Sequence, residues 1–510
     1  MRVKYSWLGI ASVFFYLGIT ILSRQFNWGE GYAKRPIISY LVLYAGAFVT
    51  YAWAVERILR NREKPPSIWF ILIFGLFFRA AILPSNQIQE DDIYRYLWDG
   101  KVFANGVNPY KFSPTEINDA KSFRISEPGK FGDRYGERER EELELLYGLK
   151  WKNDRSIIFM ERINHPDVPT IYPPLAQIVF RVVNQIRPDS ILAMRLAFLV
   201  FDLLALAFIV KILETLGKNT AFSLIYFWSP LIIKETFNST HLDIIGIAAL
   251  CGSLYFLLSG CRVIAMGFLA LGTMGKFYPA ILLPVFIRSM IQNRSVDEPL
   301  VKAWTVLGVG VTLFLMVCAG FYLQFLDVGE KTFAGLKTFT TFWENNDSLF
   351  AILVFVYKKI LGFEQSFTLE EEARLLSYDL PTFLAKLTAT GILGFSVLWL
   401  VIRPGFLRQE QSLRHCYIVM ALAFLLSPVQ NPWYLNWIIP FLCFFPSRKW
   451  ILLTGFIGFY YMDFYLDYQG INGYETLLLW VEYSPFYFML IWDYIKKIRL
   501  ALMKKFQFIC

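Results

Sequence analysis

The sequence predicts an all-α polytopic membrane protein, because its composition, aromatic content and apolar runs all favour this fold class. Of the 510 residues, 56% are hydrophobic and 18% are charged, whereas soluble domains carry about 25% charged residues. The mean hydropathy is +0.43. The chain holds 48 Phe, 28 Tyr and 15 Trp, and aromatic residues are enriched at membrane–water interfaces.

A succession of apolar runs predicts a bundle of roughly 11 to 14 transmembrane helices, because each span needs about 20 apolar residues. The expected spans are 6–22, 37–55, 67–84, 190–213, 221–238, 242–258, 263–290 (interrupted), 302–323, 381–402, 415–427, 431–446, 450–467 and 474–493. The first run follows Arg2 and Lys4, as the apolar part of a signal peptide would. No small-residue cleavage site follows it, so we interpret it as a retained helix.

Clusters of basic residues predict the orientation of this bundle. They are Arg2 and Lys4, then Arg57, Arg60, Arg62 and Lys64 after the second run, then Lys496, Lys497, Arg499, Lys504 and Lys505 in the tail. Such clusters mark the cytoplasmic side of a membrane. The third run then leads outward, so we expect the polar segment after residue 84 on the extracytoplasmic side of a plasma or inner membrane. Orientation and contact with anionic lipid account for the net charge of +9 without a nucleic-acid partner.

We divide the chain into five parts. They are N-terminal transmembrane helices at 1–84, an extracytoplasmic loop with amphipathic helices at 85–189, a transmembrane core at 190–323, an outer loop at 324–380, and C-terminal transmembrane helices with a basic cytoplasmic tail at 381–510. The charged stretch at 135–150 predicts an amphipathic surface helix. The apolar stretch at 348–361 does not fit the alternation of crossings, so we expect a re-entrant or interfacial helix there.

The most informative stretch is EDDIYRYLWDG at residues 90–100, which closely follows the third apolar run. It places Glu90, Asp91 and Asp92 in a row, with Asp99 further on. A hydrated helix end would also carry acids. Burial beside apolar chain, however, raises the pKa of a carboxylate and makes it a usable proton acceptor. Ionisable groups at a membrane edge are candidates for function, so we favour a functional site here.

A second polar cluster follows Pro230, which interrupts an expected span. Glu235, His241 and Asp243 come next, on what the predicted topology makes the outer side. His241 and Asp243 together could bind a phosphate or a sugar hydroxyl. A polar loop between two spans is an equally good interpretation.

A single lysine, Lys276, lies between two helix breakers, Gly275 and Pro279. A buried lysine is costly in a membrane and needs a partner. That partner could be a lipid-linked phosphate or an acid of a neighbouring helix, and we favour the phosphate.

Three weaker signals complete the candidate site. Tyr172 precedes two prolines in TIYPPLAQIVF, where a plain helix start is an alternative. Trp433 and Tyr434 follow Pro432 in a stretch whose broken backbone an aromatic belt alone does not explain. The stretch FWENND at 342–347 adds polar groups on the outer side.

Several chemistries are not indicated by the sequence. None of the six cysteines forms a CxxC pair, so neither a disulfide framework nor a zinc site is expected. P-loop, GxGxxG and HExxH motifs do not occur. Because the polar groups converge on the outer face, an enzyme there would need a donor carried by a lipid.

Taken together, the motifs DDIYRYLWDGKVFANGVNPY, TIYPPLAQIVF, WSPLIIKE with HLD, GKFYP and PWYLNWIIPF resemble those of GT-C superfamily glycosyltransferases. The chain is most similar to the bacterial polyprenol-phosphate-mannose-dependent mannosyltransferases and to glycosyltransferase family 87. The resemblance covers about residues 85 to 445, and its first motif is the specific one. It implies a GT-C-type helix bundle with a large, catalytic first outer loop. It also implies a polyprenyl-phosphate sugar donor, a glycan or glycolipid acceptor and inverting transfer.

The resemblance also implies roles for individual residues. Asp91 would be the general base, with Asp92 sharing or replacing that role. The expected substrate-binding residues are Tyr94, Arg95, Asp99, Tyr172, Glu235, His241, Asp243, Lys276, Trp433 and Tyr434. Lys276 and His241 are the candidates for the departing phosphate, with Arg95 and Arg195 as weaker options. No cofactor is expected, although two adjacent carboxylates could bind a divalent metal weakly.

Two competing hypotheses remain open at the level of sequence. A transporter or flippase of lipid-linked sugars would also use broken helices and intramembrane charges. An assembly protein with an inactive site is a third possibility. An outer-face cavity joining Asp91, His241 and Lys276 would favour an enzyme, whereas a midplane cavity between related halves would favour a transporter.

Overall fold

The computed structural model describes residues 4–29, 31–60, 64–292, 299–362, 380–403 and 409–507. Arg2, Arg62 and the 363–379 part of the predicted outer loop lie outside these ranges, as does Cys510. The described residues form helices and no strands, with one isolated bridge between Asn345 and Val429. The predicted all-α membrane fold is confirmed.

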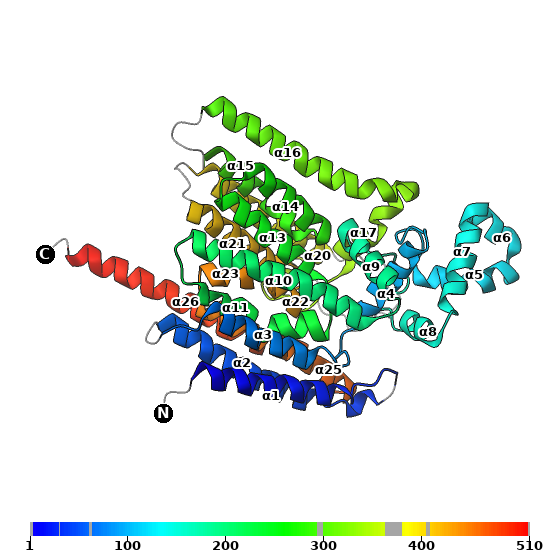
Figure 1. Cartoon of the computed structure of the whole chain (residues 1–510), viewed down its shortest axis with the longest axis horizontal. Coiled ribbons are helices and arrows are strands. Elements are labelled where there is room, and N and C mark those ends of the chain that lie inside the picture. Colours follow the sequence, from blue (N-terminus) through cyan, green and yellow to red (C-terminus); the bar gives the residue numbers. More distant parts are fainter. Residues whose placement is uncertain are drawn as a thin grey trace.

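The helices form a bundle that carries a smaller helical head at one end (Figure 1). The N-terminal elements are α1 (Tyr5–Ser23), η1 (Tyr32–Lys34), α2 (Ile37–Arg60) and α3 (Ile68–Ile82). The head contains α4 (Asp92–Ala104), α5 (Pro114–Ser126), α6 (Pro128–Arg134), α7 (Glu137–Lys150), α8 (Asp154–Glu161) and α9 (Pro174–Ile186). The amphipathic helix expected at 135–150 is α7, which buries Leu143, Leu146 and Leu149.

The middle of the chain forms the core of the bundle. Its elements are α10 (Ile191–Thr215), η2 (Thr220–Ser223), α11 (Leu224–Phe227), α12 (Pro230–Ile233), the π-helix η3 (Lys234–Asn238), α13 (Asp243–Leu258), α14 (Arg262–Gly275), η4 (Tyr278–Leu282), α15 (Leu283–Gln292) and α16 (Leu300–Tyr322). Helix α13 packs between α10 and α14, and α16 covers α14. The last part comprises η5 (Leu323–Phe333), α17 (Ala334–Phe342), α18 (Leu349–Ile360), α20 (Leu380–Ile402), α21 (Gln409–Leu426), α22 (Pro432–Leu435), α23 (Ile439–Phe444), α24 (Arg448–Phe456), η6 (Ile457–Phe459), α25 (Tyr460–Tyr468) and α26 (Glu475–Gln507).

Within the described ranges, five segments are long and apolar enough to cross a membrane. They are Tyr5–Ser23, Ile37–Arg60, Ile191–Thr215, Leu300–Phe342 and Leu380–Ile402, and shorter apolar helices lie at Ile68–Ile82, Asp243–Leu258, Arg262–Gly275 and Tyr278–Gln292. The spans expected at 221–238, 431–446 and 450–467 appear as series of short helices. Proline explains two of these breaks, since Pro230 and Pro432 each begin a new helix and cannot continue the preceding one.

Helix α18 is the piece that the sequence analysis expected to lie on the outer side without crossing. With 12 residues it is shorter than the about 20 residues that a span needs. It packs along α20, where the Tyr357 and Thr388 hydroxyls are 2.6 Å apart. Its length agrees with a non-spanning helix.

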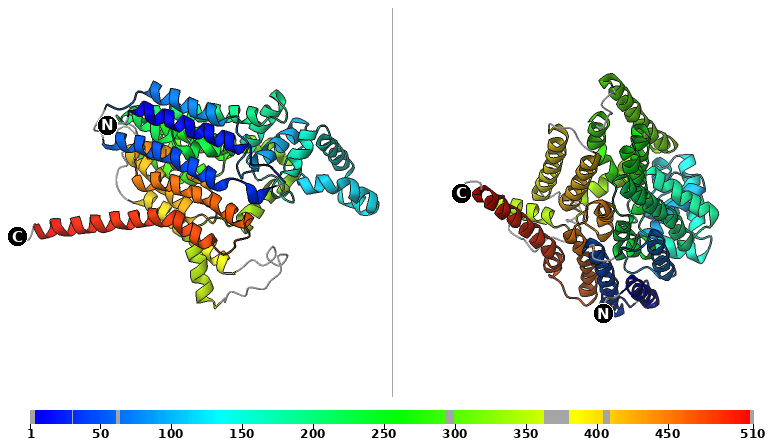
Figure 2. Two further views of the ribbon diagram at one scale, coloured as in Figure 1. Left: turned by 90° about the horizontal axis from the view of Figure 1, so that it is seen from below. Right: turned by 60° about the vertical axis from the view of Figure 1, so that its left-hand side comes forward.

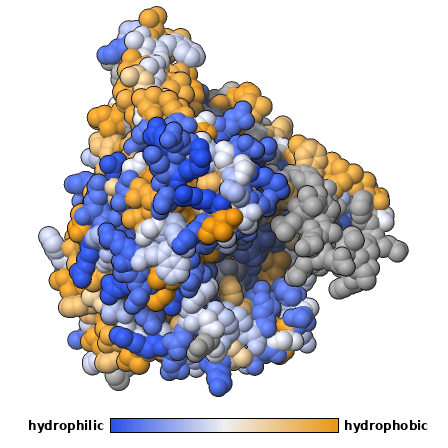
Figure 3. Space-filling view, turned by 90° about the vertical axis from the view of Figure 1, so that its right-hand side faces the viewer, coloured by the Kyte–Doolittle hydropathy of each residue, from blue (hydrophilic) through white to orange (hydrophobic). Residues whose placement is uncertain are grey.

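Both ends of the chain lie at the end of the bundle opposite to the head (Figures 1 and 2). Seen from the head, hydrophilic residues gather in the middle of the face and apolar surface lies toward its margins (Figure 3). Large apolar side chains such as Phe14, Val42, Leu315 and Phe395 are exposed on the flanks of the bundle. This distribution suits a bundle whose sides face lipid and whose ends face water.

A buried ion pair fixes α3 against α10 inside the bundle. The Nε atom of Arg79 lies 2.5 Å from Oδ2 of Asp202, and Asp202 also accepts a hydrogen bond from the Tyr226 hydroxyl at 2.7 Å. Charges at this depth are tolerated only when they are paired. The pair holds α3 in place, and with it the loop that leads from α3 to the acidic stretch.

Candidate active site

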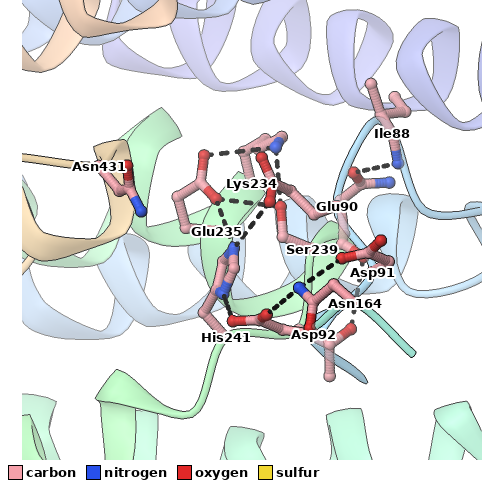
Figure 4. Close-up of polar contacts among 12 residues, drawn as sticks. Ile88, Glu90, Asp91, Asp92, Asn164, Lys234, Glu235, Ser239, His241 and Asn431 are labelled. Carbon is pink, nitrogen blue, oxygen red and sulfur yellow. Dashed lines mark hydrogen bonds and ion pairs between the residues drawn. The ribbon is translucent and has the colours of Figure 1, made fainter. Parts of the chain in front are cut away.

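The acidic stretch lies where the head joins the bundle, and four segments far apart in sequence meet there (Figure 4). The α3–α4 loop and the first residue of α4 bring Glu90, Asp91 and Asp92. The loop after α8 brings Asn164, and the chain that leaves the π-helix η3 brings His241. The start of α22 closes the site.

Asp91 and Asp92 are held by one amide. The Asn164 Nδ2 atom donates to Oδ1 of Asp91 at 2.8 Å and to Oδ1 of Asp92 at 2.9 Å. Asp91 occupies the N-cap position of α4, yet its carboxylate accepts no hydrogen bond from the helix. An aspartate at this position ordinarily caps the exposed N–H groups. Its carboxylate is instead directed toward Asn164.

His241 is enclosed by carboxylates and by an indole. Its Nδ1 lies 3.4 Å from Oδ2 of Asp92, and its Nε2 lies 3.5 Å from Glu235 and 3.8 Å from Glu90. The imidazole stacks on Trp433 with ring centroids 3.8 Å apart. Only 1% of the side chain is exposed. His241 therefore supports Asp92 and does not present a free face to a phosphate.

Behind His241, a closed polar network anchors Glu235. Its Oε1 accepts from the Tyr461 hydroxyl at 2.9 Å and its Oε2 from Ser239 Oγ at 3.0 Å. Lys234 donates to Ser239 at 2.7 Å and also contacts Tyr461. All of these groups are buried, so the sequence-predicted Glu235 lies in the wall that positions His241.

Lys276 places a separate positive charge among aromatic rings. It caps the end of α14, and its Nζ is 5.2 Å from the ring centre of Tyr434 and 5.7 Å from that of Tyr172. It lies 3.6 Å from Oδ2 of Asp243, whose Oδ1 accepts from Trp437 Nε1 at 2.6 Å. The pairing with an acid that the sequence analysis weighed is therefore present. Asp243 faces Lys276, whereas the carboxylates near His241 are those of Asp92, Glu235 and Glu90.

The two adjacent aspartates differ in acidity. Burial, together with the neighbouring charge of Asp92, raises the pKa of Asp91 to about 7. Burial alone would raise the pKa of Asp92 as well, but His241, the Asn164 hydrogen bond and the charge of Lys276 outweigh it and hold that pKa below its ordinary value. Asp92 is thus the carboxylate that stays ionised, and Asp91 is the one that exchanges a proton near neutral pH.

Backbone strain gathers around the same groups. Gln89, His165 and Thr240 adopt positive φ angles of 65°, 46° and 65°. Each directly neighbours a residue of the site in sequence. Such left-handed conformations are costly for residues other than glycine, above all for a β-branched one, and they cluster at functional sites.

Two predicted binding residues, Asp99 and Arg95, and the weaker option Arg195 form hydrogen bonds within the protein. Asp99 is 2% exposed and accepts from Gln177 of α9 at 3.1 Å. Arg95 donates to the backbone carbonyls of the loop after α8. Arg195 donates to four oxygens, namely the carbonyls of Leu83, Ser85 and Asn238 and the Thr240 hydroxyl. Their burial, which residue type alone does not reveal, directs these polar groups to partners within the protein.

The contact of α4 with α9 is close, and it explains a glycine of the first motif. A Cβ atom at Gly100 would lie 2.4 Å from the Phe180 carbonyl oxygen. Tyr96, one turn earlier, stacks on the Phe180 ring with centroids 4.7 Å apart. This packing fixes α4, and so the position of Asp92 at its start.

A comparison with protein families matches residues 165–292 to the model described as the alpha-(1->6)-mannopyranosyltransferase N-terminal domain, the MptA_B family. This part of the chain is similar to that domain, and for this similarity we call residues 165–292 the mannosyltransferase-family domain. The match supports a glycosyltransferase and agrees with the resemblance to family 87 that the motifs carry. No curated protein and no solved structure matches the chain.

The mannosyltransferase-family domain supplies part of the candidate site. Tyr172, Glu235, His241, Asp243 and Lys276 lie within it. The two aspartates and Tyr94 come from the preceding head, and Trp433 and Tyr434 come from the C-terminal helices. The site is therefore assembled around the domain by segments on both sides of it.

Sequence reasoning missed Asn164, the residue that joins the two aspartates. It lies in the short stretch Asn164-His165-Pro166, which carries no motif that marks it. It also missed Arg162, which donates to the Tyr94 hydroxyl at 2.8 Å. Tyr94 in turn lies in the wall of a cavity that Asp91 also lines.

Proposed function

We propose that the protein is an integral membrane glycosyltransferase that moves a hexose from a polyprenyl-phosphate donor to an acceptor hydroxyl. The similarity to a mannopyranosyltransferase domain favours mannose as that hexose. In this proposal the transfer inverts the anomeric centre and takes place on the extracytoplasmic side. The mannosyltransferase-family domain supports the reaction class. The placement of the head opposite to both chain ends supports the side of the membrane.

The observation that carries the proposal is the difference between Asp91 and Asp92. A general base works best when its pKa lies near the working pH, and the pKa of Asp91 is raised to about 7. Asp91 also lines a cavity, whereas Asp92 is turned toward His241 and Asn164. We therefore assign the base to Asp91. Asp92 keeps the local field negative, which sustains the raised pKa of Asp91.

The chemistry is a single displacement. Asp91 accepts the proton of the acceptor hydroxyl while the hydroxyl oxygen forms a bond to the anomeric carbon. The bond from that carbon to the phosphate oxygen breaks, and its electron pair leaves with the lipid phosphate. The departing phosphate is an anion that needs no proton, so one base and one cation suffice.

Lys276 is the cation that we assign to the phosphate. It lies at the end of α14 within an aromatic wall, and 16% of its side chain is exposed. Its charge helps to lower the pKa of Asp92. A fixed cation placed where negative charge develops is an effective way to lower a barrier. His241, which is enclosed by carboxylates, is assigned to positioning Asp92.

The proposal is tested by comparing a lipid-linked sugar donor with a nucleotide-linked one. Purified protein in liposomes is given either radiolabelled polyprenyl-phosphate mannose or radiolabelled GDP-mannose, with a mannoside acceptor. The proposal expects transfer from the lipid-linked donor alone, with a product linkage of opposite anomeric configuration by NMR. Transfer from GDP-mannose would contradict the donor class. Movement of the lipid-linked sugar across the bilayer without transfer would show that the protein is a flippase and not a transferase.

A further inference from the structure

One cavity adjoins Asp91, and most of the residues that line it lie outside the mannosyltransferase-family domain. It has a volume of about 370 Å³ and lies among the α1–α2 connection, the α3–α4 loop and α25. We propose that this cavity is a carbohydrate subsite that holds the terminal sugar of the acceptor, with Trp28 as its stacking platform. The proposal rests on the proposed function, because it assigns the acceptor side of that site.

The lining has the composition that a neutral sugar requires. Six of the 15 lining residues are aromatic, and the polar ones include four side-chain amides. Two arginines, Arg35 and Arg162, face two acids, Glu90 and Asp91. Balanced charge disfavours a phosphate or another strongly charged ligand, whereas amides, guanidinium groups and carboxylates together can donate to and accept from hydroxyls. Pockets of this size are typical of small-molecule sites.

Several polar groups in the lining are left without a partner. The Nε atoms of Arg35 and Arg162, the Gln87 Nε2 atom and the Glu90 Oε1 atom are buried and form no hydrogen bond with the described part of the chain. Glu90 itself is only 9% exposed. Unpaired buried polar groups are costly. They add to the polar character of the residues that line the cavity.

Contacts within the protein hold the walls of the cavity in place. The Arg35 guanidinium lies 4.0 Å from the ring centre of Tyr32 and donates to Gln89 Oε1 at 2.7 Å. Gln89 donates in turn to the Tyr468 hydroxyl at 2.8 Å, and the Tyr32 and Tyr468 rings stack with centroids 5.2 Å apart. Gln89 holds a left-handed backbone. These contacts fix the relative positions of three segments that are far apart in sequence, and such preorganisation favours binding.

Trp28 is the one indole of this lining, and it is 43% exposed. The Arg162 guanidinium lies 5.7 Å from its ring centre. A large aromatic side chain at the mouth of a polar cavity offers a flat apolar face next to hydrogen-bonding groups. A sugar ring has apolar C–H faces and hydroxyl edges, so it matches both. A hydroxyl held here would be next to Asp91, which lines the same cavity.

The experiment measures acceptor and donor dependence separately in the reconstituted full-length protein. Trp28→Ala is expected to raise the KM for a mannoside acceptor about tenfold, the loss of one aromatic stacking contact, and to leave the KM for the donor unchanged. Trp28→Phe should recover part of the effect. Trp151→Ala is the matched control, since Trp151 is an exposed indole of the head outside the cavity.

A second readout needs no turnover. Binding of methyl α-mannoside to the protein without donor is followed by saturation-transfer NMR, in wild type and in Trp28→Ala. Binding that weakens in the variant supports the subsite even if transfer from a lipid donor is not found. Active transfer with unchanged acceptor KM and unchanged mannoside binding in Trp28→Ala would overturn the subsite and leave the proposed function standing.

Discussion

The Nδ1 atom of His241 lies 3.4 Å from Oδ2 of Asp92, although the two residues belong to opposite sides of the junction between head and bundle. This contact lowers the pKa of Asp92 against the effect of burial. The neighbouring Asp91, whose pKa is raised, lacks it. The distinction between the two aspartates therefore depends on a residue of the mannosyltransferase-family domain.

Replacing His241 with Ala tests this dependence. Without the imidazole, burial dominates and the pKa of Asp92 rises. We expect the transfer rate at pH 7 to fall by about 10- to 100-fold and to recover partly at higher pH, where both aspartates ionise. The measurement is the pH profile of kcat, with His415→Ala in α21 as the control. An equal loss at every pH would show that His241 acts in some other way.

Replacing Lys276 with Met tests the assignment of the phosphate. Loss of a fixed cation at the leaving group is expected to lower kcat/KM for the donor by on the order of 100- to 1,000-fold. Lys276→Arg keeps the charge and should retain more activity than the Met variant. Steady-state kinetics over a range of donor concentrations distinguishes the two. Equal activity in the wild type and the Met variant would place the phosphate elsewhere.

The pH dependence of the wild-type enzyme reports on Asp91. A protonated carboxyl cannot accept the hydroxyl proton, and the pKa of Asp91 is about 7. The rate should therefore rise tenfold per pH unit below this value and level off above it. The quantity to measure is kcat/KM from pH 5 to pH 9, because it reports the pKa of the free enzyme. A flat profile across this range would be incompatible with Asp91 as the base.

The free energy of unfolding should depend on pH in the opposite direction to the rate: it should fall as pH rises. The pKa of Asp91 is raised from an ordinary value of 3.8 to about 7 in the folded protein. Between these two values the folded state holds a proton that the unfolded state has lost. The stabilisation that this proton gives is fully present below pH 3.8 and is lost as pH rises through 7. Asp91→Asn removes the buried charge, and we expect it to raise the Tm at pH 8 more than at pH 5.

Differential scanning fluorimetry in detergent at both pH values makes this comparison. The exposed Asp133 of the head provides the matched control, because Asp133→Asn makes the same chemical change outside the site. A lower Tm at pH 8 for Asp91→Asn would mean that the ionised carboxylate stabilises the fold.

The sequence predicted the bundle and its acidic edge because both are local patterns. Apolar runs mark helices wherever they occur, and prolines such as Pro230 and Pro432 mark breaks. The row of acids in the first motif stands out against apolar chain. Lys276 was found for the same reason, as a lone charge among apolar residues.

What the sequence did not reveal depends on tertiary contacts. Asp99 and Arg95 share a motif with Asp91, but only the packing of α4 on α9 and the loop after α8 shows that their polar groups are bonded within the protein. Asn164 carries no signal of its own. The Trp28 cavity combines residues separated by most of the chain, so no local pattern could predict it.

The most direct test of the account is the transfer of radiolabelled mannose from polyprenyl phosphate by Asp91→Asn, compared with wild type and with Asp133→Asn. Donor binding is measured in the same preparations. If Asp91 is the base, the Asp91 variant binds donor normally and loses transfer by on the order of 100- to 10,000-fold, whereas the Asp133 variant stays active. Transfer at the wild-type rate by Asp91→Asn would remove Asp91 from the chemistry and contradict the account at its centre.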